Sequence, residues 1–177
     1  MTHERRSIEM EIRARGRRLE GYAATFGTDA RINEQFIESI APGAFTASLR
    51  SGKDILALVD HDPGKLLARS RTKTMRLSED SKGLAFELDV PDTQTGRDVL
   101  ALADRGDLGG MSFSFTSVDE HRDGDRRELR AVELHEISVV LAWPAYGGTI
   151  VNARSLCVPT PLRNSAERRL RFLELSQ

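Results

Sequence analysis

The sequence lacks the features that mark several classes of protein. It contains one cysteine, Cys157, among 177 residues, which excludes an intramolecular disulfide framework and a zinc site built from several cysteines. No apolar run approaches the roughly 18 residues of a membrane-spanning helix, and the charged N-terminal stretch MTHERRSIEMEIRARGRR lacks the apolar core of a signal peptide. We therefore expect a soluble protein of a reducing, intracellular compartment.

The sequence also has little net charge. Its 26 Lys and Arg residues nearly balance its 27 Asp and Glu residues, for a formal net charge of -1. This balance argues against a nucleic acid or an anionic membrane as partner, so we expect the partners to be proteins. Hydrophobic residues make up 39% of the chain and charged residues 30%, which over this length suits one domain with an ordinary core.

Much of the chain alternates apolar and polar residues with the period of two that indicates β-strands. In residues 7–14, Ile8, Met10 and Ile12 alternate with charged residues. Further strands are predicted at 19–26, 54–59, 72–80, 83–90, 111–118 and 128–143, the last of them long enough to be bent or bulged. The pattern predicts a mainly β fold with flanking helices, in which a largely antiparallel sheet is closed or nearly closed as a β-barrel.

Two helices are predicted between the strands, and a change in composition marks a tail. The segment IAPGAFTASLRSG suggests an extended stretch followed by a short helix that ends at Gly52. The clearer helix lies in TQTGRDVLALADRG, with Thr95 as its N-cap and Gly106 as its C-terminal stop. Two prolines and a basic helical segment near the C-terminus predict a domain of residues 1–156 and a linker with a helical tail of residues 157–177.

Two serines follow a Gly-Gly pair at the start of a predicted strand. Ser112 and Ser114 occupy alternate positions of DLGGMSFSF, so their hydroxyl groups share one face of the strand. His61 follows the strand at 54–59, where the Pro-Gly pair at 63–64 is expected to lead the chain into a loop. A serine, a histidine and a carboxylate that meet in space can perform nucleophilic hydrolysis.

The residue that would orient the histidine is left open by the spacing. His135 and Glu136 lie in the strand expected to pair with that of the serines, and they are expected to face opposite sides of it, so at most one can contact His61. Structural roles are equally compatible with the pattern: the serines as small strand residues, and His61 as a loop histidine between two aspartates. The stretch HRDGD is interpreted as a solvated hairpin tip, and we expect no metal ion and no cofactor.

Six separated segments of the chain form a pattern when they are taken in order: GYAATFGT, ESIAPGAFTASL, LVDHDPGKLLARS, KGLAFELDVPDTQTGRD, RGDLGGMSFSF and ELHEISVVLAWPAY. In this combination they resemble the prohead (procapsid) maturation proteases of tailed phages. Together they cover roughly residues 20–155, and their joint occurrence is far more specific than any single segment. The fold and catalytic logic of this family are similar to those of the herpesvirus assembly proteases, so the resemblance implies a β-barrel of the herpesvirus-protease type.

The resemblance implies a serine endopeptidase with three assigned residues. The general base of the family, the histidine of an HD pair, falls on His61, and the nucleophile of its GMSF motif falls on Ser112. The family usually has glycine two positions later, where this chain has Ser114, which becomes the fallback nucleophile. The third residue is Glu136 by the match of EIS to the family's EVS-like motif, whereas the herpesvirus relatives use a second histidine, which would be His135. We prefer Glu136 because a carboxylate orients and stabilises an imidazole more strongly than a neutral ring does.

The resemblance also implies a substrate and a place of action. The protease would cut the scaffolding segment of the major capsid protein, and itself, inside the assembling procapsid in the host cytoplasm of a phage or prophage. Its copies could associate as a homo-oligomer at the high local concentration within the shell. Two alternatives stay open: a catalytically inactive capsid-assembly or scaffolding factor with the same fold, and a hydrolase of some other ester or amide.

Overall fold

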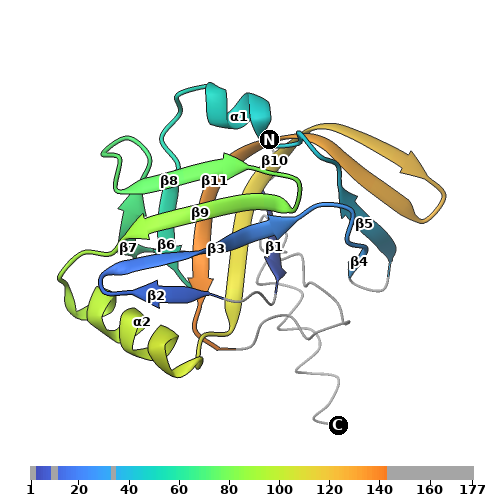
Figure 1. Ribbon diagram of the computed structural model, residues 1–177. Helices are drawn as coiled ribbons and strands as arrows, with labels where there is room; N and C mark the ends of the chain where they lie inside the picture. Colours follow the sequence, from blue (N-terminus) through green and yellow to red (C-terminus); the bar gives the residue numbers. More distant parts are fainter. Residues whose placement is uncertain (1–2, 9–11, 33–34, 143–177) are drawn as a thin grey trace, which may run out of the picture.

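The computed structural model describes residues 3–8, 12–32 and 35–142, which form two β-sheets and two helices (Figure 1). The larger sheet consists of β1 (Glu4–Ile8), β4 (Ala30–Ile32), β5 (Phe36–Ile40), β6 (Leu56–Val59), β7 (Asp62–Arg69), β10 (Gly110–Asp123) and β11 (Arg126–Val140). The smaller sheet consists of β2 (Arg13–Arg15), β3 (Arg18–Thr25), β8 (Met75–Glu79) and β9 (Gly83–Asp89). The helices are α1 (Thr46–Arg50) and α2 (Gln94–Arg105).

Strand β11 organises the larger sheet. One of its edges pairs with β10 in antiparallel orientation over nearly its whole length. Its other edge pairs in parallel with β5 over residues 126–129 and with β6 over residues 136–139. All other strand pairs of the described residues are antiparallel, so the predicted mainly β and largely antiparallel fold is confirmed.

The predicted closure into a barrel is not confirmed. Over the described ranges, the order β1-β10-β11-β5-β4 begins and ends at free edges, and so does the order β2-β3-β9-β8. The physical reason lies in β11, where β5 and β6 share one edge at opposite ends, so that the larger sheet branches instead of continuing around an axis. The strand expected at 7–14 is also divided, because β1 joins the larger sheet and β2 the smaller one.

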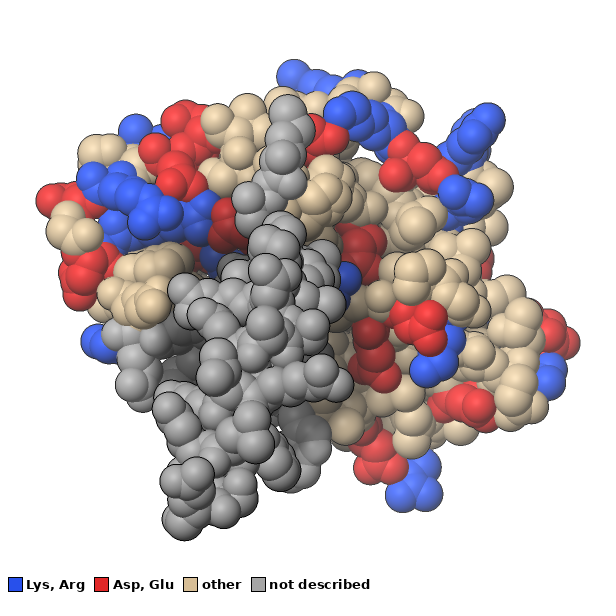
Figure 2. Space-filling model, turned by 180° about the vertical axis from the view of Figure 1, so that it is seen from behind, with Lys and Arg blue, Asp and Glu red and all other residues tan. Residues whose placement is uncertain are grey.

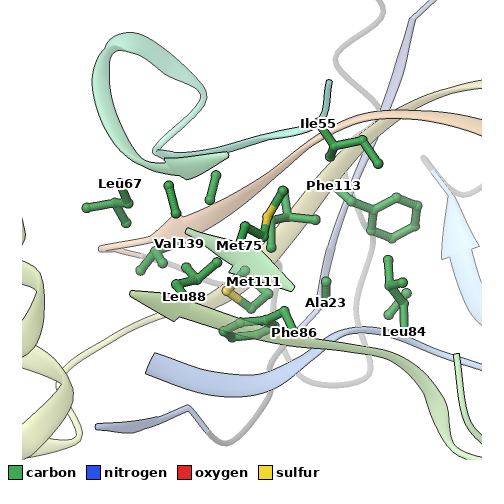
Figure 3. Close-up of a cluster of buried hydrophobic side chains, with 14 of the residues drawn as sticks. Ala23, Ile55, Leu67, Met75, Leu84, Phe86, Leu88, Met111, Phe113 and Val139 are labelled. Carbon is green, nitrogen blue, oxygen red and sulfur yellow. The ribbon is translucent and has the colours of Figure 1, made fainter. Parts of the chain in front are cut away.

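The hydrophobic core lies between the two sheets (Figure 3). Met111 and Phe113 of β10 and Val139 of β11 face Phe86 and Leu88 of the smaller sheet, and all five are buried. Since side chains alternate along a strand, the residues between these positions point to the opposite face of the larger sheet. The core therefore decides which face of β10 and β11 carries the polar residues of the candidate site.

The connection from β6 to β7 is shorter than expected. Pro63 and Gly64 were expected to begin a loop, but both lie within β7. Strand β7 pairs only with β6 among the described strands, so a proline without an N–H group is tolerated on its free edge. The turn between the two strands thus consists of Asp60 and His61 alone.

Helix α2 begins earlier than the sequence suggested. Its N-cap is Thr93 instead of Thr95, and the Thr93 hydroxyl accepts a hydrogen bond from the Gly96 N–H at 3.1 Å. A Cβ atom at Gly96 would lie 2.1 Å from the carbonyl oxygen of Pro91, so the close approach of the helix to the preceding chain requires glycine there. The helix ends at Gly106 with φ 73°, as predicted.

On the face shown in Figure 2, the described residues carry both signs of charge side by side. None of the helices within these residues is long and apolar enough to cross a membrane. The last residue of the strand predicted at 128–143 lies outside the described residues, as do Cys157 and the tail of residues 157–177. The domain boundary expected at residue 156 stays a prediction.

Candidate active site

The turn that carries His61 is tied to β11. Asp60 and His61 have φ values of 49° and 61°, the positive values of a two-residue hairpin turn that usually contains Asn or Gly. The Asp60 N–H donates to the carbonyl oxygen of Val139 at 2.9 Å, and Asp60 Oδ1 accepts from the Leu141 N–H at 3.0 Å. Non-glycine residues at positive φ cost free energy and concentrate at functional sites. The contacts with β11 hold His61 in this unfavourable conformation.

A hydrogen-bonded cluster joins His61, Glu136 and Ser138. Nδ1 of His61 contacts Oε1 of Glu136, and the other carboxylate oxygen, Oε2, accepts from the Ser138 hydroxyl at 2.9 Å. The Ser138 Oγ in turn accepts from the backbone N–H of His61 at 3.2 Å. Ser138 is fully buried, and the side chains of His61 and Glu136 are 15% and 10% exposed. The structure thus brings together the histidine and the carboxylate that the sequence motifs suggested.

A β-bulge places His135 differently from the expected strict alternation. The pairing of β10 with β11 shifts at this point and leaves His135 as an extra residue between Leu134 and Glu136. The His135 Nε2 contacts the Thr116 hydroxyl at 2.8 Å, and its ring stacks on His3 with the ring centroids 4.1 Å apart. Burial lowers the pKa of His135, and the neighbouring His3 lowers it further. His135 therefore belongs to a separate cluster with His3 and Thr116, and it is Glu136 that contacts His61.

Both candidate serines lie on the face of the sheet that carries this cluster. Ser112 is directly opposite Ser138 in the pairing of β10 with β11, and Ser114 is directly opposite Glu136. The Cβ atoms of such directly opposite residues lie about 5 Å apart. Both serines are buried, Ser112 fully. The register of two strands thus brings two hydroxyl groups into the immediate surroundings of the His61–Glu136 pair.

The Ser112 hydroxyl is directed toward β1. It donates to the carbonyl oxygen of Arg6 at 2.8 Å. Strand β1 flanks β10 on one side and β11 flanks it on the other, so this hydrogen bond points away from His61. Rotation about the Cα–Cβ bond would redirect the hydroxyl. The structure thus shows Ser112 in the row of Ser138, with its hydroxyl directed away from His61.

The arrangement defines the proton-carrying nitrogen of His61. A carboxylate accepts hydrogen bonds and cannot donate them, so the nitrogen that contacts Glu136, Nδ1, carries the proton of a neutral imidazole. Nε2 then has a free lone pair and can accept a proton from a serine hydroxyl.

The N–H of Gly109 donates to the carbonyl oxygen of Val140 at 2.8 Å, so it is not available as an oxyanion donor in this conformation.

A comparison with known families decides what kind of protein carries this site. The sequence model of the family described as caudovirus prohead serine protease matches residues 3–158, a range that includes His61, Ser112 and Glu136. The chain belongs to this family. A prohead serine protease acts inside the procapsid, and its substrate is in general a capsid protein. No curated protein and no solved structure matches the chain.

Two features of the candidate site of this prohead protease family member were missed by the sequence analysis. One is the Ser138 hydroxyl, which contacts both His61 and Glu136. The alternation of β11 indicates that Ser138 shares the face of Glu136, but no local pattern shows that its hydroxyl reaches the turn after β6. The other is the carbonyl oxygen of Arg6, a backbone atom that could not be found from residue types.

Proposed function

We propose that this chain is an active serine endopeptidase in which Ser112 is the nucleophile, His61 the general base and Glu136 the residue that orients His61. The single observation that carries the proposal is the contact of His61 Nδ1 with Glu136 Oε1 on the sheet face of Ser112. This contact supplies two of the three roles that serine hydrolysis needs, a base with a free nitrogen and a group that fixes its tautomer.

The strand register favours Ser112 over Ser114 as the nucleophile. The backbone N–H of His61 is bound to Ser138, which lies in the same cross-strand row as Ser112. Ser114 lies two rows further along, opposite Glu136, whose two carboxylate oxygens contact His61 and Ser138. This register supports Ser112 as the hydroxyl that approaches the free side of the imidazole, whereas Ser114 is paired with the residue that bears the carboxylate.

Catalysis requires a rearrangement of the Ser112 hydroxyl. The hydroxyl leaves the Arg6 carbonyl oxygen, turns toward His61 and transfers its proton to Nε2 as Oγ attacks the scissile carbonyl carbon. His61 then gives this proton to the amine of the leaving peptide, and water hydrolyses the acyl-enzyme by the same steps in reverse order. Because Ser112 is fully buried, its face must also open to admit a peptide.

The proposed substrates are the scaffolding segment of the major capsid protein and the chain itself. The proposal follows from membership of the prohead protease family, and it includes cleavage in the host cytoplasm within the assembling shell and association between copies of the chain. The relationship to the herpesvirus assembly proteases stays a prediction.

Coexpression with the cognate major capsid protein tests the proposal. The wild-type chain, Ser112→Ala and Ser114→Ala are each expressed with the capsid protein, and the intact masses of both proteins are measured. We expect the wild type and Ser114→Ala to shorten the capsid protein and Ser112→Ala to leave it intact, since loss of a triad member lowers the rate by several orders of magnitude. Processing by Ser112→Ala would refute the assignment of the nucleophile. Assembly of particles without cleavage by any variant would refute the protease activity itself.

A further inference from the structure

We propose that Ser138 is a positioning residue that holds His61 and Glu136 in their mutual orientation. The proposal rests on the function proposed above and adds a fourth residue to the site. Ser138 does not need to touch the substrate, because its hydroxyl acts through the two residues that it binds.

The hydrogen bonds of Ser138 join two different parts of the chain. Its hydroxyl proton is donated to Oε2 of Glu136 on the same strand, and its oxygen accepts the backbone N–H of His61 in the β6–β7 turn. One hydroxyl group therefore fixes the rotation of the carboxylate and the position of the histidine backbone together. These are the two variables that decide whether Nδ1 of His61 meets Oε1 of Glu136.

The hydroxyl of Ser138 lies inside the sheet, shielded from water. Its side chain is fully buried, and it lies between Ser112 of β10 and Leu58 of β6 in the cross-strand row. Over the described residues, no buried side-chain polar atom lacks a hydrogen-bond partner, so the hydrogen bonds of Ser138 belong to a network in which every buried polar atom is paired. Without the hydroxyl, the carboxylate is free to turn, and the His61 turn, with its positive φ values, loses one of its ties to β11.

Kinetic comparison of Ser138→Ala with Ser48→Ala tests the proposal. Ser48 is a matched control, because it is also a buried serine whose hydroxyl accepts a backbone N–H of β11, that of Leu134 at 2.9 Å, but it lies on α1 away from His61. We expect Ser138→Ala to lower kcat for capsid-protein cleavage roughly 10- to 100-fold with little change in KM, since small misplacements of catalytic groups act on the transition state. Ser48→Ala should keep the wild-type kcat.

A second pair of variants covers the case in which Ser138→Ala does not fold. Ser138→Thr and Ser138→Val have nearly the same size, and only the first keeps a hydroxyl group. We expect the threonine variant to cleave at least about tenfold faster than the valine variant. Equal rates for this pair, or a wild-type kcat for folded Ser138→Ala, would overturn the positioning role while the proposed protease function stands.

Proton NMR separates the positioning role from the protease function. The proton of His61 between Nδ1 and Glu136 Oε1 should give a low-field resonance in the wild type, identified by its loss in Glu136→Ala. We expect Ser138→Ala to shift or broaden this resonance and Ser48→Ala to leave it unchanged. If the wild type cleaves no substrate, the proposed function fails. In that case the resonance still tests whether Ser138 orients His61. An unchanged signal in Ser138→Ala would refute the positioning role.

Discussion

Replacement of Glu136 by glutamine should force His61 into the wrong tautomer. In the wild type, Oε2 of Glu136 accepts the Ser138 hydroxyl proton, and the Ser138 oxygen already accepts the His61 N–H. We expect the hydroxyl to keep donating toward residue 136, so that in Glu136→Gln it selects the amide oxygen and turns the amide NH₂ toward Nδ1 of His61. Nδ1 must then accept, the imidazole proton moves to Nε2, and Nε2 can no longer take a proton from Ser112.

We expect a large loss of cleavage rate in Glu136→Gln, because the substitution keeps the shape of the site but removes the proton acceptor. Glutamine has the shape of glutamate, so the cluster remains packed, but the base nitrogen is blocked. A wrong tautomer of this kind lowers kcat by roughly 10⁴-fold in a serine triad, which corresponds to about 5 kcal/mol of transition-state stabilisation. Loss of the negative charge that stabilises the imidazolium acts in the same direction.

The assay compares capsid-protein cleavage by the wild type, Glu136→Gln and Glu133→Gln. Glu133 is the matched control, because it lies on the same strand but pairs with Lys53 at the surface, at 2.5 Å. Nitrogen-15 NMR of the imidazole should show the proton on Nδ1 in the wild type and on Nε2 in Glu136→Gln. A Glu136→Gln variant that cleaves within about tenfold of the wild-type rate would refute the assigned role of Glu136.

Two further predictions concern the ion pairs among β1, β5, β10 and β11. Glu38 is buried between the guanidinium groups of Arg6 and Arg127, so Glu38→Gln should lower the free energy of unfolding in urea by about 3–5 kcal/mol; a loss below 1 kcal/mol would contradict this. Burial raises the pKa of Glu120, but hydrogen bonds from Arg122, Ser117 and Arg127 outweigh it and lower the pKa from 4.5 to about 2. The stability that Glu120 contributes is therefore fully present above pH 4.5, and about 3 kcal/mol of the free energy of unfolding is lost as the pH falls through 2. Measurements of the free energy of unfolding against pH should show a smaller loss in Glu120→Gln than in the wild type.

The sequence by itself determined the class of fold and the identity of the candidate site residues. The alternation in β10 predicted that Ser112 and Ser114 would share the face opposite Phe113, because the period of two follows from local backbone geometry. The motifs around His61 and Glu136 pointed to the two residues that the structure brings into contact. The stop of α2 at Gly106 was predicted for a similarly local reason, the positive φ that glycine adopts easily.

Only the tertiary structure decided how these residues meet. His61 and Glu136 are 75 positions apart, and their contact depends on β6 pairing in parallel with the end of β11, a choice between strands that no local pattern encodes. Pairing between distant strands also produces three other features: the bulge at His135, the hydrogen bonds of Ser138, and the branching that leaves the sheets open. Local sequence determines which face of a strand a side chain occupies, whereas its neighbours across the sheet are set by the register of strands distant in the chain.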